Sequence, residues 1–414
     1  MGAGPGVRCA VMLHPTEALT RILERVGEAS RVETVPLAMA AGRLLAKAVV
    51  SDVNLPPFEK AMMDGVALRA SDAAEPGARL RIVGESRAGV PFAGSVPPGA
   101  AIEIYTGAEL PAELDAVEMV ERTSREGDDV VLENAIRPEQ HVSHTGEILG
   151  VGRPALAPPR RLTPADLSVL ASVGCHQVPV FRQPRVTILT TGDELVPVAE
   201  TPGTGQIREG NTLYLAAAVA KVGGLVLDAG IVRDDEAELE RAFGRALAEG
   251  DVLVTTGGVS MGKYDLVGKT LERLGVEPVL HKVAIKPGKP IWFGMAGDKP
   301  VFGLPGNPVS SLLGFETFVR PALAKLAGAG PDEVKERIGH GVWRGPTERA
   351  RGRQFNLPAI RSLDESGVVQ LSPVAYLGSA DIVGASRADA LAIVPEGENV
   401  EPGQVVEFRP LTLP

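Results

Sequence analysis

The middle of the chain alternates short apolar runs with amphipathic stretches, and this alternation restricts the possible fold more than any other feature. The β-branched apolar runs cover residues 186–189, 225–232, 252–255 and 301–304, and helical patterns cover residues 213–222, 237–248 and 266–274. Buried strands that alternate with helices predict a parallel sheet covered by helices. The sequence therefore predicts an α/β domain over residues 183–330.

Polar or glycine-rich segments follow each of these predicted strands. They are residues 191–194, Asp234 with Asp235, residues 257–260, and residues 303–307. Ligands of parallel α/β sheets bind beyond the carboxyl ends of the strands. We therefore expect these four segments to meet in one composite site.

Acidic residues at this edge predict a divalent cation. Glu194, Asp234 and Asp265 would repel a phosphate unless a Mg²⁺ ion bridged carboxylate and phosphate oxygens. We therefore expect these three residues to be metal ligands. The simpler alternative is that acidic residues occupy turns and helix N-termini, which fits Asp235 and Glu236 better than Asp193 and Glu194.

Two glycine-rich loops between a strand and a helix predict an anion site. The first loop carries Gly257, Gly258 and Ser260, and the second carries Gly303, Pro305, Gly306, Asn307 and Pro308. Glycines let the backbone approach a ligand, and Asn followed by Pro is typical of the start of a helix. Backbone N–H groups at such a helix start bind phosphate or another oxyanion. A purely structural turn is the alternative for each loop.

Three lysines precede the second loop. Lys282, Lys286 and Lys289 alternate with Pro287 and Pro290, whose fixed backbone would hold the ammonium groups in place. We expect them to recognise a diphosphate or a carboxylate, and a solvated surface is the alternative.

Composition excludes several classes of function. The 414 residues carry 44% apolar residues and a net charge of −10, which disfavours nucleic acid and anionic membranes as partners. The longest uncharged apolar run, residues 213–220, is much shorter than the ~20 residues of a membrane span. Cys9 and Cys175 have no metal-ligand spacing, and their scarcity predicts a reducing, cytoplasmic location.

The rest of the chain predicts three further domains. Residues 53–152 are rich in Gly and Pro with short alternating runs, which indicates a β-rich insert. Residues 15–52 and 153–182 around it predict a scaffold with helical patterns at 15–30 and 163–174, and the first of these helices could instead pack on the α/β domain. Residues 331–414 predict a small β-barrel. Asp64 in the insert fits an Asx turn.

Five motifs in order resemble the MoeA family of molybdopterin molybdenumtransferases, which is related to the C-terminal part of gephyrin. The motifs are MDG at 63–65, TGDEL at 191–195, TGGVSMGKYD at 256–265, AIKPGKP at 284–290 and GLPGNPVS at 303–310. The resemblance extends from about residue 15 to residue 410.

The resemblance implies a four-domain, elongated homodimer. Its active cleft would lie between the α/β domain of one subunit and the insert and barrel of the other. The implied reaction uses adenylylated molybdopterin, molybdate and Mg²⁺, inserts molybdenum into the dithiolene, and releases AMP. Other cofactor-biosynthesis proteins are further candidate partners.

The resemblance also implies roles for particular residues. Asp64, Glu194, Asp265 and Lys286 match catalytic positions, with Asp64 acting across the dimer cleft. Matched or neighbouring positions that would bind substrate are Thr106, Asp234, Gly257, Gly258, Ser260, Lys282, Lys289, Gly303, Pro305, Gly306, Asn307, Pro308 and Ser379.

Three segments depart from the family pattern. Ala61 and Val66 replace a hydroxyl residue and an aromatic residue, and residues 141–148 lack the family's two arginines and aspartate. Only Asn211 remains of a DTN-like segment at 209–211. These changes leave open whether the oxyanion is molybdate or tungstate. Two alternative functions remain. The chain could be an adenylyltransferase that makes the adenylylated pterin, or a non-enzymatic carrier or scaffold.

Overall fold

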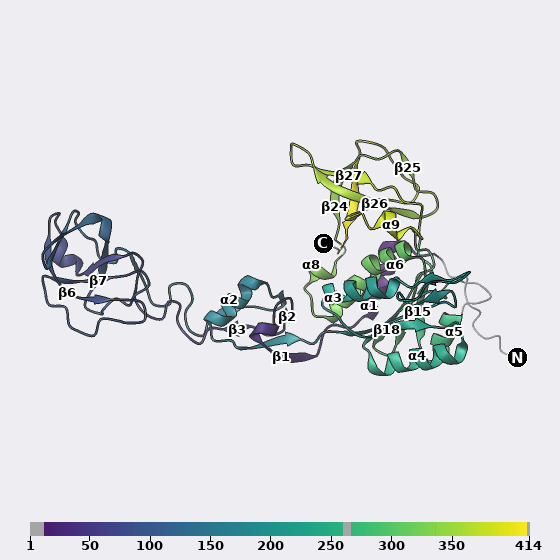
Figure 1. Ribbon diagram of the computed structural model, residues 1–414, viewed down its shortest axis with the longest axis horizontal. Helices are drawn as coiled ribbons and strands as arrows, with labels where there is room; N and C mark the ends of the chain where they lie inside the picture. Colours follow the sequence, from purple (N-terminus) through teal and green to yellow (C-terminus); the bar gives the residue numbers. More distant parts are fainter. Residues whose placement is uncertain (1–11, 260–265, 336, 412–414) are drawn as a thin grey trace.

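The computed structural model describes residues 12–259, 266–335 and 337–411. The molecule is elongated: an α/β domain and a C-terminal barrel lie at one end, and an arm extends from them (Figure 1). The arm carries a scaffold next to the α/β domain and an insert at its far end. Among the described residues, no helix is both long and apolar enough to span a membrane.

A six-stranded sheet forms the centre of the α/β domain, in the order β18-β15-β19-β23-β22-β20. Its strands are β15 (Arg185–Thr191), β18 (Leu225–Val232), β19 (Val252–Thr256), β20 (Glu277–His281), β22 (Trp292–Ala296) and β23 (Lys299–Leu304). The four strands predicted from the sequence are parallel, whereas β22 and β20 pair antiparallel at one edge. The sheet is therefore mixed rather than purely parallel.

Helices cover both faces of this sheet. They are α1 (Pro15–Arg25), α3 (Asn211–Lys221), α4 (Glu236–Glu249), α5 (Leu266–Arg273), α6 (Pro308–Gly314), the π-helical turn η4 (Phe315–Val319) and α7 (Arg320–Leu326). The short helix α8 (Pro331–Val334) has no buried residue and lies against α7. Phe243 of α4 is fully buried on one face, and Phe315 and Phe318 of η4 are fully buried on the other. The backbone stays helical from α6 through η4 to α7. The helix predicted after the second glycine loop is therefore one continuous helix that contains a π turn.

Helix α1 belongs to the α/β domain and not to the scaffold. Its apolar side chains Ala18 and Ile22 are fully buried in the same cluster as the sheet strands. The helix ends at Arg25, earlier than the pattern suggested, shortly before Gly27, a residue type that weakens a helix.

The scaffold is a small β layer with one helix. Its elements are β1 (Val32–Pro36), η1 (Leu37–Met39), β2 (Leu44–Leu45), β3 (Val49–Val50), β12 (Pro154–Leu156), β13 (Arg160–Arg161), α2 (Pro164–Ser172) and β14 (Gln177–Phe181). Helix α2 begins with a capping box in which Thr163 and Asp166 exchange hydrogen bonds. This helix matches the sequence expectation closely.

The insert is built on a six-stranded sheet in the order β8-β5-β7-β6-β10-β9, beside a two-stranded β11-β4 pair. Its elements are β4 (Lys60–Ala61), β5 (Gly65–Leu68), η2 (Ala70–Ala73), β6 (Arg79–Ser86), β7 (Ala100–Ile104), β8 (Ala116–Met119), η3 (Val120–Arg122), β9 (Thr123–Glu126), β10 (Asp129–Leu132) and β11 (Val142–Ser143). The β-rich character expected from its turns is therefore present.

Five C-terminal strands close into a barrel, because β26 pairs with both β27 and β28. The elements are β24 (Gly339–Trp343), β25 (Glu348–Arg349), β26 (Gln354–Leu363), β27 (Val369–Pro373), α9 (Ile382–Ala385), β28 (Ala390–Val394), β29 (Asn399–Val400) and β30 (Val405–Pro410). Strand β21 (Ile285–Lys286) of the α/β domain adds to β26. Barrel and α/β domain are thus joined through a sheet.

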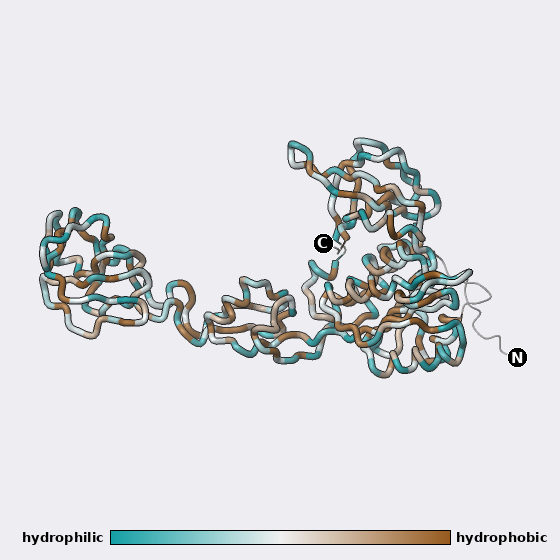
Figure 2. The backbone as a smooth tube through the Cα atoms, in the orientation of Figure 1, coloured by the Kyte–Doolittle hydropathy of each residue, from teal (hydrophilic) through white to brown (hydrophobic). Residues whose placement is uncertain are grey.

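The arm and the barrel are attached to the α/β domain in different ways. Apolar segments recur along all parts of the chain (Figure 2), and the scaffold, the insert and the barrel each have buried clusters of their own. Leu391 and Leu411 of the barrel region also enter the main α/β cluster, whereas the scaffold cluster contains scaffold residues and their arm neighbours only. The barrel is therefore fused to the α/β core, and the arm is connected by its chain crossings and polar contacts.

Candidate active site

A cavity of about 770 Å³ lies at the carboxyl ends of the parallel strands. The residues that line it from these ends are Thr191, Gly192, Glu194, Asp234, Gly257, Gly258, Pro305, Gly306, Asn307 and Pro308. The four segments that the sequence placed at this edge therefore converge. The α/β side is also lined by Leu195 of β16 (Leu195–Val196), Ile207 and Arg208 of β17 (Ile207–Arg208), and Tyr214 of α3.

Close backbone contacts explain the glycines of the two loops. A Cβ atom at Gly257 would lie 2.3 Å from the carbonyl oxygen of Thr191, and the residue has a φ of +86°. A Cβ atom at Gly306 would lie 3.5 Å from the Cα atom of Gly257, so the two loops nearly touch. Gly303 is different because it lies inside β23, where a Cβ atom would approach Val259 to 2.8 Å. It supports the loop from the sheet and is not among the lining residues.

Buried polar side chains hold the floor of the cavity together. The Glu209 carboxylate accepts hydrogen bonds from the Thr212 amide at 2.8 Å and the Thr190 hydroxyl at 3.3 Å. The Asn211 side-chain amide donates to the Gly306 carbonyl at 2.7 Å. The start of α3 is thereby tied to β15 and to the second glycine loop. These bonds fix the spacing between the loops before any ligand arrives.

The acidic side of the cavity favours a cation. Burial, followed by the negative charges of Asp193 and Glu194, raises the pKa of Asp234 above its ordinary value. A cation beside Glu194 and Asp234 would relieve this repulsion, and Mg²⁺ accepts one or two carboxylates together with substrate phosphate oxygens. The described part of the chain holds no cluster of three or more His, Cys, Asp or Glu with metal-site geometry. The described residues therefore fit a Mg²⁺ ion held by two carboxylates together with substrate phosphate oxygens, and not one held by protein ligands alone.

The start of α6 is linked to the barrel. Asn307 occupies the N-cap position, but its side-chain amide donates to the Ser379 hydroxyl at 2.9 Å instead of capping the helix. The carbonyl oxygen of Ser379 accepts from the Val309 amide at 3.0 Å. Ala380 and Ile382, next to Ser379, line the cavity. The barrel of the same chain therefore supplies one wall of the site, whereas the resemblance implied that this barrel would come from the other subunit.

The three lysines lie near the cavity but are not among its lining residues. Pro290 does line it. Lys286 lies in β21, with its Nζ atom 4.1 Å from the centroid of the Phe355 ring in the barrel. None of the three lysines forms an ion pair with residues that the structure describes. Lys282 has a φ of +78°, an uncommon conformation for a lysine.

Two arginines at this junction were not found by sequence reasoning. Arg351 and Arg353 precede Phe355, and β26 pairs with β21 at residues 354 and 355. The Arg353 guanidinium donates to the Ile285 carbonyl at 3.4 Å. The pairing of β21 with β26 therefore brings basic residues of two domains together. The signal available in the sequence was the spacing of Arg349, Arg351 and Arg353, but nothing local connected it to the lysines.

Asp64 and Thr106 form a separate exposed centre in the insert. The Asp64 carboxylate accepts hydrogen bonds from the backbone amide and the hydroxyl of Thr106, both at 2.7 Å. These bonds lower the pKa of Asp64. Asp64 therefore bonds a residue distant in sequence, and not its own turn as the Asx interpretation suggested. Within one chain the scaffold separates this centre from the cavity (Figure 1).

Two expected site residues, Ser260 and Asp265, lie outside the described residues. Val259, which precedes them in the sequence, is described and lines the cavity.

Comparison with known families covers nearly the whole chain. Residues 13–174 match the "MoeA N-terminal region (domain I and II)", residues 187–325 the "Probable molybdopterin binding domain", and residues 342–411 the "MoeA C-terminal region (domain IV)". The chain belongs to the MoeA family.

Curated relatives and solved structures agree with this membership. The chain is 34% identical to a molybdopterin molybdenumtransferase of Haemophilus influenzae, over 96% of this chain and 98% of the relative. It is 31% identical to that of Bacillus subtilis, over 94% of this chain and 92% of the relative. A crystal structure of a molybdopterin biosynthesis MoeA protein from Pyrococcus horikoshii superposes with a TM-score of 0.82 at 30% identity, covering 97% of this chain and 99% of that one.

One departure of this MoeA chain from the family motif has a clear local solution. Residues 209–211 read Glu-Gly-Asn instead of a DTN-like segment. Glu209 nevertheless accepts from the Thr212 amide, as a capping carboxylate does at the start of a helix. The longer side chain therefore keeps the first turn of α3 in place.

A second departure lies beside the Asp64 centre. Where the MoeA motif has arginines, His144 bonds the Glu59 carboxylate through Nδ1 at 2.7 Å. Strand β11, just before His144, pairs with β4, and the Met62 amide donates to the His141 carbonyl at 2.9 Å. The altered segment thus still holds the strand that leads to Asp64.

Sequence reasoning also missed Tyr214. This residue lines the cavity, and its ring packs edge-on against Phe315 with centroids 6.3 Å apart. Burial, and then the nearby charge of Glu316, raises the pKa of its hydroxyl well above the ordinary value. Tyr214 therefore stays neutral. In the sequence it looked like one more residue of an amphipathic helix.

Proposed function

We propose that the chain is a molybdopterin molybdenumtransferase that converts adenylylated molybdopterin and molybdate into molybdenum cofactor and AMP. The observation that carries this proposal is the convergence of two glycine loops, two carboxylates and a barrel wall on one cavity. The names of the relatives support the choice of reaction. A cytoplasmic location is part of the proposal and rests on the cysteine content.

The phosphate groups of the substrate would lie on the glycine loops. Backbone N–H groups at Gly258 and Gly306 are the candidate donors, because both residues line the cavity without a Cβ atom. The Gly257 N–H instead donates to the Leu304 carbonyl at 3.1 Å and holds the two loops together. Amides held rigidly by the surrounding fold bind an anion without having to reorganise. The fixed spacing of the loops supports recognition of a pyrophosphate in one orientation.

The basic junction would hold molybdate, which is a substrate here. Lys289 precedes Pro290, which lines the cavity, and Lys286 and Arg353 lie where β21 pairs with β26. The α/β domain and the barrel therefore both contribute positive charge at this junction. Cations without ion-pair partners among the described residues remain available to an oxyanion. The cation–π contact of Lys286 with Phe355 would orient that ammonium group.

Glu194 and Asp234 would hold Mg²⁺, with Asp265 as a third candidate ligand. When bound, Mg²⁺ stabilises negative charge on the pyrophosphate oxygens as the bond to AMP breaks. The pKa of Asp234 is raised by burial and then by the charges of Asp193 and Glu194, and a bound cation would stabilise the ionised carboxylate, which supports this assignment. The carboxylates themselves orient the phosphate relative to the glycine loops.

Asp64 and Thr106 would complete the site from a second copy of the chain. In one chain the scaffold lies between their centre and the cavity, so a partner must supply them if they act there. The lowered pKa of Asp64 keeps its carboxylate ionised at neutral pH. A homodimer with shared active sites follows as part of the proposal.

The direct test is AMP release by the purified full-length protein. With adenylylated molybdopterin and Mg²⁺, AMP should appear only when molybdate is added, and a chelator should stop it. Repeating the assay with tungstate measures the choice of oxyanion.

Glu194→Gln should reduce the rate by roughly two orders of magnitude, because it removes a fixed charge at the reacting phosphates. Glu200→Gln is the control, since Glu200 is an exposed carboxylate in the neighbouring loop that does not line the cavity. Pyrophosphate formation from ATP and molybdopterin would instead identify an adenylyltransferase. Tight pterin binding without AMP release would identify a carrier.

A further inference from the structure

The arm joins the α/β domain through two adjacent chain crossings. Arg31 lies at one crossing, just before β1, and Arg182 lies at the other, just after β14. The Arg182 amide donates to the Arg31 carbonyl at 2.9 Å, and Val32 pairs with Phe181 beside them. The two crossings therefore form one two-stranded stem.

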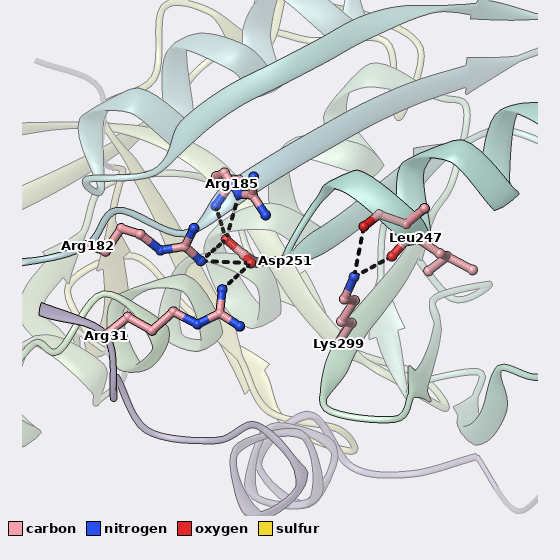
Figure 3. A network of polar contacts seen from close by, with 7 residues as sticks. Arg31, Arg182, Arg185, Leu247, Asp251 and Lys299 are labelled. Carbon is pink, nitrogen blue, oxygen red and sulfur yellow. Dashed lines mark hydrogen bonds and ion pairs between the residues drawn. The ribbon is translucent and has the colours of Figure 1, made fainter. Parts of the chain in front are cut away.

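Both crossings bind the same carboxylate (Figure 3). Asp251 Oδ1 lies 3.6 Å from Arg31 Nη1, and Arg182 Nη2 lies 3.0 Å from both carboxylate oxygens. Asp251 also accepts from the Arg185 amide at 2.9 Å and from Arg185 Nε at 3.4 Å. A single side chain of the α/β domain thus holds each strand of the stem.

The surroundings keep Asp251 ionised. Burial alone would raise its pKa, but the Arg185 amide and the guanidinium groups of Arg182 and Arg185 lower it overall. The side chain is only 19% exposed, so solvent screens these contacts less than it screens a surface ion pair. Lys299 does not compete for Asp251, because its ammonium group donates to the carbonyls of Leu247 and Ala248 at the end of α4 (Figure 3).

Asp251 and the cavity lie at opposite ends of one strand. Asp251 immediately precedes β19, and Gly257 and Gly258 immediately follow it. Strand β19 lies inside the sheet between β15 and β23, and all five of its residues are buried. At about 3.3 Å per residue, it is a rigid spacer of roughly 17 Å between stem and cavity.

We infer that Asp251 is a positioning residue for the proposed reaction: it fixes the stem of the arm on β19 and thereby sets the angle at which the arm presents Asp64 and Thr106 to the cavity of the second copy. Asp251 does not touch the cavity, so it acts through the insert. The catalytic consequence rests on the proposed function. The mechanical part, a carboxylate that fixes the stem, does not. Asp251 shares this role with a second ion pair between the scaffold and the α/β domain, Arg161 with Glu333 at 2.8 Å.

The test is Asp251→Asn in the full-length protein, measured in two ways. The kcat of molybdate-dependent AMP release should fall by roughly 10- to 100-fold, because small displacements of a reacting group have effects of this size. The Kd for adenylylated molybdopterin should stay unchanged, since the cavity is intact. Small-angle X-ray scattering should show a broader distribution of interdomain distances.

A second variant and a control keep the test decisive if Asp251→Asn folds poorly. Arg182→Gln removes the ion pair between one strand of the stem and Asp251. Asp251 still accepts from the Arg185 amide, so its contact within the α/β domain is kept. It should shift kcat and scattering in the same direction by a smaller amount. Asp228→Asn breaks an exposed ion pair with Arg245 inside the α/β domain and should change neither measurement.

The inference is overturned if Asp251→Asn and Arg182→Gln both keep wild-type kcat and scattering. It is also overturned if kcat and pterin affinity fall together with the melting temperature, because that pattern indicates a general structural role. If the wild-type protein releases no AMP, the proposed function fails, and the scattering data alone still decide whether Asp251 orients the arm.

Discussion

The two halves of the candidate site are built in opposite ways. The cavity in the α/β domain is formed by one chain, and buried bonds from Glu209 and Asn211 connect its loops. The insert presents Asp64 and Thr106 on an exposed surface, with two hydrogen bonds between them. The cavity is therefore preorganised to bind a ligand, whereas the insert offers a single oriented carboxylate.

The pKa shifts in the two halves also have opposite signs. Burial, and then the charges of Asp193 and Glu194, raise the pKa of Asp234 in the cavity, whereas hydrogen bonds from Thr106 lower that of Asp64. A carboxylate with a lowered pKa is a weak proton acceptor at neutral pH. Asp64 is therefore suited to act as a fixed negative charge or a hydrogen-bond acceptor, and the cavity to accept a cation.

The largest effect is expected from removing the Asp64 carboxylate in the insert half of the site. Asp64→Asn should abolish molybdate-dependent AMP release while pterin binding and the melting temperature stay at wild-type values. Asp128→Asn, in an exposed turn of the same insert, is the control and should keep full activity.

Mixing inactive variants shows whether the halves come from different copies. Dimers formed at random from Asp64→Asn and Glu194→Gln chains should recover about a quarter of wild-type activity, because half of them contain one intact site out of two. No recovery after subunit exchange has been verified would contradict shared sites.

Removing the charge of Asp234 in the cavity should raise the stability of the protein but weaken its binding of magnesium. Because the pKa of Asp234 is raised, the folded chain binds its proton more tightly than the unfolded chain does, and the ionised carboxylate lowers stability at neutral pH. Asp234→Asn should therefore raise the melting temperature at pH 7 without Mg²⁺, and this gain should shrink as the pH falls through the raised pKa. Magnesium should bind at least roughly tenfold more weakly. A lowered melting temperature in magnesium-free buffer would contradict the assignment.

A matched pair of glycines compares the backbone of the two halves. Gly257 in the cavity and Gly107 in the insert have nearly equal φ values of +86° and +85°. Either substitution by Ala costs about 1–2 kcal/mol for the left-handed conformation. Only Gly257→Ala also places a Cβ atom 2.3 Å from a carbonyl oxygen, while Gly107 has open space around it. Chemical denaturation should show a clearly larger loss for Gly257→Ala, and equal losses would contradict the tight packing of the loops.

The sequence predicted the cavity half much better than its surroundings. Strand ends and glycine loops are local signals, and the topology of a parallel sheet brings them to one edge, so Glu194, Asp234, Gly257 and Gly306 could be placed together. The antiparallel β20 and β22 carry no equivalent signal, because short apolar runs do not encode strand direction.

Contacts between domains were not predictable for a related reason. The approach of Arg353 to the lysine segment depends on β21 pairing with β26, which are separated by a long stretch of chain. The burial of α1 in the α/β core and the bond between Asp64 and Thr106 also join distant segments. A single sequence specifies the faces of such elements but not their partners.

The smallest effect is expected at the His144–Glu59 pair, which supports the insert half. His144 also faces Glu139, whose carboxylate lies 3.9 Å from Nε2, and Glu147, which accepts from the His144 amide. The hydrogen bond with Glu59, and then the surrounding carboxylates, raise the pKa of His144. Its stabilising contribution is therefore fully present below the ordinary pKa of about 6.5 and is lost as the pH rises through the raised value.

His144→Gln should lower the melting temperature only on the acidic side of this transition. Melting curves from about pH 5 to about pH 9 at low salt should show a difference from wild type that disappears at high pH, and salt should reduce it because the pair is exposed. Glu59→Gln removes the other partner of this bond, but it also weakens the acceptor of the Thr145 amide. It should therefore show the same pH-dependent loss together with a loss that remains at high pH. A difference that is constant across the pH range would mean that His144 supports the strand before Asp64 by packing and not by charge.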